Sequence, residues 1–152
     1  MDASNSVVIL LADDDEDDRM LTVDALRVSK VANNLKTVND GEELMNYLRH
    51  CGMHAPPASS PRPALILLDL NMPRKNGWEV LKEIKADPAL RSIPVIVLTT
   101  SKEEEDVERT YDLGVNSFIM KPVSFAGLVE VMNSAIEYWF KIVQLPSGPK
   151  EP

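Results

Sequence analysis

Short apolar runs alternate with longer amphipathic segments along this chain. The apolar runs predict strands at 7–12, 35–39, 64–69, 93–98 and 116–120. The segments between them repeat apolar residues at helical spacing and predict helices at 17–28, at 41–49, at 77–86, from a capping box at 101–104 to about 114, and from 124 to about 143. Strands separated by helices in this way imply right-handed βαβ units and one parallel sheet that is covered on both faces.

The number of strand–helix units narrows the fold. Six units are typical of a dinucleotide-binding fold, whereas five indicate an α/β flavodoxin-like (βα)5 fold with strand order 2-1-3-4-5. We predict one domain over residues 1–145, ending in an extended C-terminal helix. Two segments fall outside the pattern: a Pro/Ser-rich loop over 54–62, and a tail over 146–152 with three prolines and no apolar anchor. The tail is predicted to be disordered.

Carboxylates follow two of the predicted strands at the point where each strand ends. Asp13 and Asp14 follow the first strand, and Asp69 follows the third, an apolar run bounded by Pro63 and Pro73. In a parallel sheet the carboxyl ends of neighbouring strands meet at one edge, where open α/β sheets bind their ligands. Like charges this close stay ionised only beside a cation. Because the ligands are oxygens without His or Cys, we predict a hard cation, Mg²⁺ in particular.

The same edge is predicted to carry a hydroxyl and an ammonium group. Thr99 and Thr100 follow the fourth strand, and Lys121 follows the fifth. A lysine supplies a positive point charge suited to a phosphoryl oxygen, and a hydroxyl can hydrogen-bond to another such oxygen. With a carboxylate nucleophile and a divalent cation, these groups are the parts needed for phosphoryl transfer through an acyl phosphate.

Composition removes several classes of function. The 24 acidic residues outnumber the 16 basic ones and give a formal charge of -8, with no basic cluster that would bind nucleic acid. The apolar runs are too short to span a bilayer, and the N-terminus lacks the basic region of a signal peptide. The single cysteine, Cys51, excludes an internal disulfide. We therefore expect a cytoplasmic protein that binds neither nucleic acid nor membrane.

Four motifs, in this order and at these spacings, resemble the receiver domain of two-component response regulators. They are Val-Ile-Leu-Leu-Ala-Asp13-Asp14-Asp, Leu-Ile-Leu-Leu-Asp69-Leu-Asn-Met-Pro73-x-x-x-Gly77, Val-Ile-Val-Leu-Thr99-Thr100 and Phe118-Ile-Met-Lys121-Pro122. The resemblance covers residues 6–143. It implies a single-domain switch in phosphorelay signalling, which accepts a phosphoryl group from a sensor histidine kinase and signals through protein–protein contacts. Such a protein is a phosphoacceptor rather than an enzyme, and it catalyses only its own phosphorylation and dephosphorylation.

The resemblance also assigns roles around the carboxylates. Asp69 would be the phosphoacceptor and would contribute to the metal site. Asp14 would bind Mg²⁺ directly, and Asp13 would act mainly through water. The backbone carbonyl of Asn71 would complete the metal shell. These roles come from the resemblance and not from the spacing of the residues.

A second group of residues is implied to bind the phosphoryl group and to report its presence. Lys121 would pair with the phosphoryl group, and Thr99 would move toward it. Thr100 is larger than the small residues common at its position and would narrow access. Phe118 takes the place of the switch aromatic on the fifth strand but has no hydroxyl for a polar latch. The Lys121–Pro122 bond is implied to be cis.

The acidic run from Asp15 to Asp18 has a plainer interpretation. Acidic residues in the first turn of a helix are favoured by the helix dipole, so we expect a solvated helix start. An EF-hand beginning at Asp13 fits poorly because Gly at its sixth position and Glu at its twelfth are both missing.

The last predicted helix carries two apolar stripes. The stripe assigned to the core consists of Leu128, Val131, Met132, Ala135, Trp139 and Ile142. The other stripe consists of Val129, Ile136, Phe140 and Val143. A helix that covers a sheet needs one stripe, so the second predicts an exposed patch and a homodimer through this helix. The alternative is that the extension packs back on its own domain. The ending Glu-Tyr-Trp-Phe-Lys-Ile-Val-Gln-Leu-Pro resembles receivers paired with bacterial phytochrome kinases.

Two other functions stay open at this point. A phosphohydrolase of the haloacid dehalogenase type also uses an aspartyl nucleophile on an α/β sheet. That family has Asp-x-Asp followed by Gly-Thr or Gly-Val, whereas this chain has Asp-Asp-Asp-Glu over 13–16 and Asp-Leu-Asn over 69–71. The other alternative is an unphosphorylated docking module. A receiver could also pass its phosphoryl group to a His phosphotransfer protein.

Overall fold

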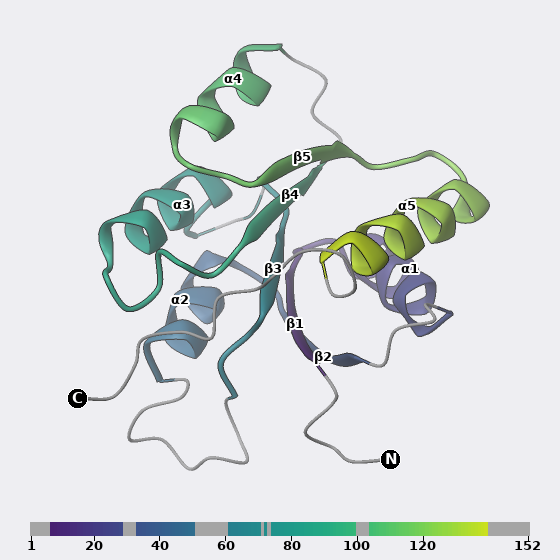
Figure 1. Cartoon of the computed structure of the whole chain (residues 1–152), viewed down its shortest axis with the longest axis horizontal. Helices are drawn as coiled ribbons and strands as arrows, with labels where there is room; N and C mark the ends of the chain where they lie inside the picture. Colours follow the sequence, from purple (N-terminus) through teal and green to yellow (C-terminus); the bar gives the residue numbers. More distant parts are fainter. Residues whose placement is uncertain are drawn as a thin grey trace.

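The computed structural model describes residues 7–28, 33–50, 61–70, 72, 74–99 and 104–139. These residues form alternating strands and helices (Figure 1), in the order β1 (Val7–Ala12), α1 (Glu16–Arg27), β2 (Asn33–Val38), α2 (Gly41–His50), β3 (Leu65–Leu68), α3 (Gly77–Ala86), β4 (Val95–Thr99), α4 (Glu104–Asp112), β5 (Ser117–Met120) and α5 (Phe125–Glu137). Every predicted strand and helix is present. The predicted disordered tail and most of the Pro/Ser-rich loop lie outside the described residues.

The strands form one parallel sheet in the order β2-β1-β3-β4-β5. β1 pairs with both β2 and β3, so that Leu11 lies opposite Thr37 on one side and Leu67 on the other. β4 pairs with β3 and β5. The predicted flavodoxin-like strand order is therefore confirmed.

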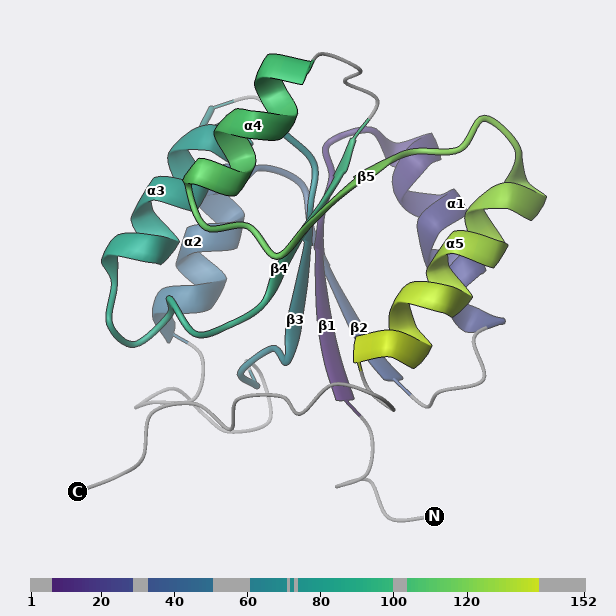
Figure 2. The same cartoon turned by 45° about the horizontal axis from the view of Figure 1, so that its top comes forward.

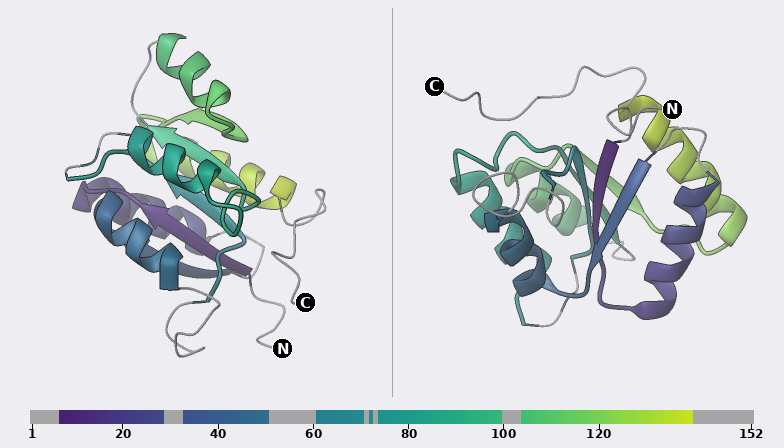
Figure 3. Two further views of the ribbon diagram at one scale, coloured as in Figure 1. Left: turned by 90° about the vertical axis from the view of Figure 1, so that its left-hand side faces the viewer. Right: turned by 90° about the horizontal axis from the view of Figure 1, so that it is seen from below.

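Helices cover both faces of this sheet. Figure 2 shows α1 and α5 against one face and α2, α3 and α4 against the other. The right-hand view of Figure 3 shows the same layers from below, with α1 beside α5 and α2 beside α3. No helix in the described part of the chain is long and apolar enough to cross a membrane.

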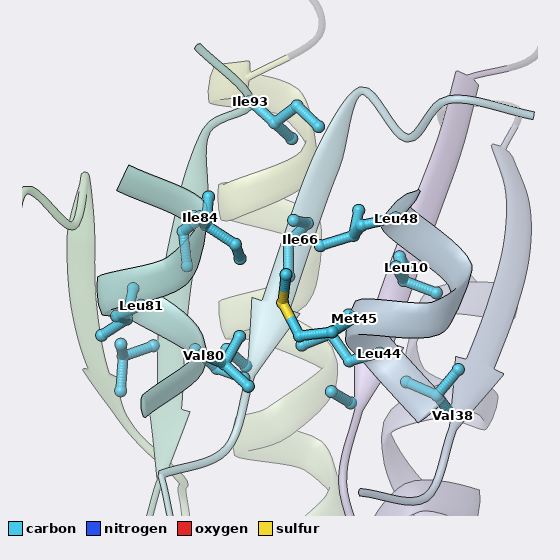
Figure 4. Packing of buried hydrophobic residues seen from close by; sticks show 14 of the residues in the cluster. Leu10, Val38, Leu44, Met45, Leu48, Ile66, Val80, Leu81, Ile84 and Ile93 are labelled. Atoms are coloured by element: carbon cyan, nitrogen blue, oxygen red, sulfur yellow. The ribbon is translucent and has the colours of Figure 1, made fainter. Parts of the chain in front are cut away.

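Side chains of the central strands alternate between two hydrophobic cores. In β1, Leu10 lies in the core under α2 and α3, whereas Leu11 lies in the core under α1 and α5. In β3, Ile66 and Leu67 divide in the same way. Figure 4 shows the first core, in which side chains from α2 and α3 meet those from β1 and β3. Burial on both faces explains why these strands are continuous apolar runs in the sequence.

Side-chain caps fix the starts of several helices. Asp15 caps α1, Asn76 caps α3 and Ser124 caps α5, each by accepting a hydrogen bond from a backbone N–H in the first turn. The Ser124 cap agrees with the predicted start of the last helix at residue 124. The predicted capping box of Ser101 with Glu104 involves side chains that lie outside the described part of the structure.

The buried face of α5 differs from the predicted one. Leu128, Met132 and Ile136 are its buried residues, and Ile136 is fully buried in the core that α5 shares with α1. The expectation that Ile136 lies on an exposed stripe is therefore wrong. Val129 is half-buried against the same core. Because α5 packs on α1 as well as on the sheet, its buried face turns toward α1 and centres on an i, i+4, i+8 row.

The other residues of the two predicted stripes lie partly within and partly outside the residues that the structure describes. Val131, Ala135 and Trp139 were assigned to the core but are only half-buried. Phe140 and Val143 lie outside the described residues, as does the part of the predicted helix that follows Trp139.

Ile136→Ala measures how strongly α5 is held on its own domain. We expect the free energy of unfolding to fall by about 3 kcal/mol, because a fully buried side chain leaves a cavity. The half-buried Val131→Ala is the matched control, with an expected loss of about 1 kcal/mol. Urea unfolding followed by circular dichroism gives both values. Equal losses for the two variants would contradict the assignment of Ile136 to the core.

Candidate functional site

The hydrogen-bond ladder of the sheet continues past the strands and sets the backbone of the site. The Asp69 N–H donates to the carbonyl of Ala12 at 3.0 Å, and the Lys121 N–H donates to the carbonyl of Thr99 at 2.8 Å. Asp13 follows Ala12 directly in the chain. Asp13, Asp69 and Lys121 therefore leave the sheet at the same edge, as the predicted topology requires.

Three carboxylates converge at this edge. Oxygen atoms of Asp13, Asp14 and Asp69 lie within 4.8 Å of one another. Asp13 and Asp69 are buried, whereas Asp14 is exposed. The predicted convergence of these acids is confirmed. An octahedral Mg²⁺ shell spans about 4.2 Å between opposite oxygens, so the three carboxylates have nearly the spacing that one such ion needs. An all-oxygen set fits a hard divalent cation.

Lys121 brings its ammonium group into this cluster. Its Nζ atom lies 2.8 Å from Asp13 Oδ2, 3.2 Å from Asp18 Oδ2 and 3.5 Å from Asp69 Oδ2. The Lys121 side chain is only 9% exposed. An ammonium group has three N–H donors, so these carboxylates match its full donor capacity.

The pKa of Lys121 is raised by its neighbours. Burial alone would lower it, because a charged ammonium group loses hydration. The hydrogen bond to Asp13 and the charges of Asp69 and Asp13 outweigh that loss. Lys121 is therefore a permanent cation at neutral pH and remains one well into the alkaline range.

The Asp13 side chain and backbone are held by further contacts from α1 and its cap. Asp13 Oδ1 accepts a hydrogen bond from the Asp15 N–H at 3.0 Å. Arg19 Nη1 donates to the Asp13 carbonyl at 2.9 Å. The carboxylate of Asp13 thus has one oxygen on the backbone and the other on Lys121. These contacts fix the orientation of a buried acid that would otherwise have several rotamers.

Asp18 is a member of the site that the sequence interpretation missed. We expected it to be a solvated acid at a helix start, but its carboxylate contacts Lys121. The contact follows from topology, because the first turn of α1 comes directly after the carboxyl end of β1 and borders the same edge of the sheet. The sequence does not distinguish Asp18 from Glu16 and Asp17, the other acids in the first turn of α1.

The other predicted site residues are only partly within the described structure. Thr99 is fully buried at the end of β4. Phe118 lies on β5 and packs, partly buried, against the core under α2 and α3. The Phe118 N–H donates to the Tyr111 hydroxyl of α4 at 3.3 Å, so a hydroxyl group lies beside the backbone of Phe118. Asn71 and Thr100 lie outside the described residues.

One expectation about the backbone is wrong. The described residues contain no cis peptide bond, so the Lys121–Pro122 bond is trans. Trans is the lower-energy form even before proline, by about 0.5–1 kcal/mol.

The loop after β3 packs tightly against the start of α2. A Cβ atom at Gly41 would overlap the carbonyl oxygen of Lys75 and lie 2.7 Å from its carbonyl carbon. Arg74 pairs with Asp40 at 3.8 Å, and Asp40 in turn caps the first turn of α2 through the Glu43 N–H. Glycine at position 41 therefore allows two backbone segments to touch beside the site.

Lys75 is also fixed from the side of α3. It donates a hydrogen bond to Glu83, which pairs with Arg49 of α2 at 2.7 Å. The hydrogen bond from Lys75 lowers the pKa of Glu83, although burial partly opposes this effect. The loop that follows Asp69 is thus held between α2 and α3.

Comparisons with known proteins agree with this geometry. The family model of the response regulator receiver domain matches residues 9–133. The chain is 41% identical over 141 residues to response regulator Rcp1 of Synechocystis sp., and the match covers 93% of this chain and 94% of Rcp1.

Two solved structures are similar over the same length. The phosphorylated cyanobacterial phytochrome response regulator RcpA shares 44% identity with a TM-score of 0.84. The Mn²⁺-bound form of response regulator Rcp1 shares 41% identity with a TM-score of 0.82. Each match covers 93% of this chain and 99% of the other. The fold, the carboxylate cluster and these matches favour phosphorelay signalling with a divalent metal over a phosphohydrolase, and the chain belongs to the response regulator receiver domain family.

Proposed function

We propose that this protein is a single-domain response regulator whose receiver, residues 1–145, accepts a phosphoryl group on Asp69. The observation that carries the proposal is the arrangement of charges at one edge of the sheet. Carboxylates of Asp13, Asp14 and Asp69 lie within 4.8 Å of one another, and the Lys121 ammonium group lies 3.5 Å from Asp69. This arrangement has a nucleophile, a place for a divalent cation and a fixed positive charge.

The proposed reaction moves a phosphoryl group between two protein side chains. A carboxylate oxygen of Asp69 attacks the phosphorus of a kinase phosphohistidine. The new O–P bond forms as the N–P bond breaks, and the bonding pair stays on the imidazole nitrogen, which takes up a proton. Hydrolysis restores the free Asp69 carboxylate, because water attacks phosphorus, the O–P bond to Asp69 breaks and inorganic phosphate leaves. The protein turns over no separate substrate.

Asp13, Asp14 and Asp69, with the Asn71 carbonyl, would hold Mg²⁺. When bound, the cation supplies charge neutralisation at the phosphoryl oxygens. The Asp13 carboxylate is already turned into the cluster by its contacts with Lys121 and Asp15. The exposed Asp14 leaves one side of the cluster open to water.

The phosphoryl group would be bound by Lys121 and by residues at the end of β4. The Lys121 ammonium group would bond to a phosphoryl oxygen, and the Thr99 hydroxyl would turn toward another. Thr100 would border the same oxygens. Phe118 has no hydroxyl to form a hydrogen bond with Thr99. Its side chain would therefore respond to the movement of Thr99 only through a change in packing. Phosphorylation would then change the surface around β4 and β5.

Relatives suggest the partners of this switch. RcpA is described as a cyanobacterial phytochrome response regulator, and we propose a bacterial phytochrome as the sensor histidine kinase for this chain. Onward transfer to a His phosphotransfer protein is a further proposed route. We place the protein in the cytoplasm, where a sensor kinase exposes its phosphohistidine.

We also propose a homodimer through the C-terminal helix. Phe125 and Tyr138 are the exposed large apolar residues of this helix and its C-cap in the described part of the chain. Tyr138 borders a groove that is also lined by Tyr111, Phe118, Val131 and Trp139. Size-exclusion chromatography with light scattering, run on wild type and on Phe140→Asp, tests the dimer. A wild-type monomer at high concentration would rule it out.

The test of the proposed function is intact-mass spectrometry after incubation with acetyl phosphate and Mg²⁺. We expect one phosphoryl group, which is labile to hydroxylamine as an acyl phosphate and absent when EDTA is present. If rapid hydrolysis hides the adduct, beryllium fluoride binding detected by ¹⁹F NMR replaces it. Failure of both measurements contradicts the proposal, and multiple turnover of a phosphate monoester would favour a phosphohydrolase.

A further inference from the structure

We propose that Asp18 is a positioning residue that holds the Lys121 ammonium group away from Asp69 in the unphosphorylated protein. The inference rests on the proposed function, because it concerns how readily Lys121 reaches a phosphoryl group on Asp69. It adds a residue on α1 to the groups that set the affinity of the site for that phosphoryl group.

The distances around Lys121 carry this inference. Its Nζ atom is nearest to Asp13 at 2.8 Å, next to Asp18 at 3.2 Å, and farthest from Asp69 at 3.5 Å. The Asp69 distance is at the outer limit of a hydrogen bond, so the ammonium group is displaced toward β1 and α1. A lysine side chain is long and flexible, and it takes the position that its partners impose.

Asp18 is well placed to impose that position. Its N–H donates to Asp15 Oδ1 at 3.0 Å and its carbonyl accepts from Thr22 Oγ1 at 3.0 Å, so its backbone belongs to the regular first turn of α1. The Asp18 side chain is 39% exposed, whereas those of Asp13 and Asp69 are 1% and 10% exposed. Among these carboxylates, Asp18 is the one that water can solvate most easily when Lys121 moves away.

Asp18 also competes with an incoming anion for the Lys121 ammonium group. A phosphoryl group on Asp69 adds negative charge within reach of the Lys121 ammonium group, and the Asp18 carboxylate competes with it for the same cation. Neutralising Asp18 removes this competitor. The phosphoryl group, or beryllium fluoride in its place, should then bind more tightly.

The experiment is a titration of beryllium fluoride at saturating Mg²⁺ into wild type, Asp18→Asn and Asp17→Asn, by isothermal titration calorimetry. Asp17 is the exposed neighbour of Asp18 on α1, so Asp17→Asn controls for the loss of one charge. We expect about threefold tighter binding for Asp18→Asn, consistent with a partly exposed ion pair. Asp17→Asn should bind about as wild type does. Asp18→Glu, which keeps the charge, should restore wild-type affinity.

A double-mutant cycle separates positioning from a general effect on structure. In a Lys121→Met background, Asp18→Asn should lose most of its effect, because the ammonium group on which it acts is gone. Unchanged or weaker binding for Asp18→Asn, or the same gain with and without Lys121, overturns the inference while the proposed function stands. A wild-type protein that binds no beryllium fluoride overturns both.

Discussion

Asp69→Asn takes up no phosphoryl group from acetyl phosphate in the presence of Mg²⁺. The amide has no anionic oxygen to attack phosphorus, and the change keeps the size of the side chain and therefore the packing at the end of β3. Intact-mass spectrometry should show one adduct on wild type and on Asp17→Asn, and none on Asp69→Asn. An adduct that persists on the variant would place the phosphoacceptor on another carboxylate, and peptide mapping after borohydride reduction would then locate it.

The same variant should be more stable than wild type without a metal. Carboxylates of Asp13, Asp14 and Asp69 lie within 4.8 Å of one another, and like charges this close repel. Removing one of them should raise the unfolding temperature in EDTA by about 3 °C, which corresponds to about 1 kcal/mol in a domain of this size. Added Mg²⁺ should stabilise wild type more than the variant, so the difference should shrink or reverse. Thermal unfolding with and without Mg²⁺ measures both effects.

Lys121→Met should separate metal binding from phosphoryl binding. We expect tighter Mg²⁺ binding, because the ammonium group that repels the cation is gone, and about 100-fold weaker binding of beryllium fluoride, because its charge partner is gone. The latter is about 2.7 kcal/mol, within the range for removing one partner of a buried charge pair. Lys82→Met, which removes an exposed lysine on α3, should bind both as wild type does. Parallel changes in the two affinities of Lys121→Met would contradict the assigned role.

Lys121→Met should also lower the stability of the protein, by an amount that does not vary between pH 6 and 9. Without metal, Lys121→Met leaves the 1%-exposed Asp13 carboxylate without its cation, and we expect a loss of about 3 kcal/mol. The pKa of Lys121 is raised on folding, so its contribution is complete below the unfolded lysine pKa of about 10.4 and is lost only as pH rises through the higher folded value. Between pH 6 and 9 this contribution should therefore be constant. A decline of the Lys121 contribution within that interval would contradict the raised pKa.

The fold was accessible from the sequence because a parallel sheet ties chain order to spatial order. Each buried strand is an unbroken apolar run, and the residue after it must lie at the carboxyl edge. For this reason the order of the strands along the chain is enough to bring Asp13, Asp69 and Lys121 together. Their roles in phosphoryl transfer came from the resemblance to receiver domains, and they remain proposals.

What the sequence did not reveal depends on how helices are turned and how loops touch. Apolar spacing shows that α5 has a buried face, but the direction of that face depends on α1, and Ile136 was therefore placed on the wrong side. Asp18 looks like any other acid in a first helical turn until β5 brings Lys121 beside it. Gly41 has no side chain to interpret, and only the position of Lys75 shows why glycine is there.

The contact between Gly41 and Lys75 also limits how this site could be engineered. A designer who wished to retune the switch would exchange the segment after β3 for one from another receiver. Any replacement with a longer or differently directed backbone would collide with the start of α2, which has no side chain at position 41 left to remove. The segments after β2 and β3 should therefore be transplanted as one unit, together with Asp40 as the partner for Arg74.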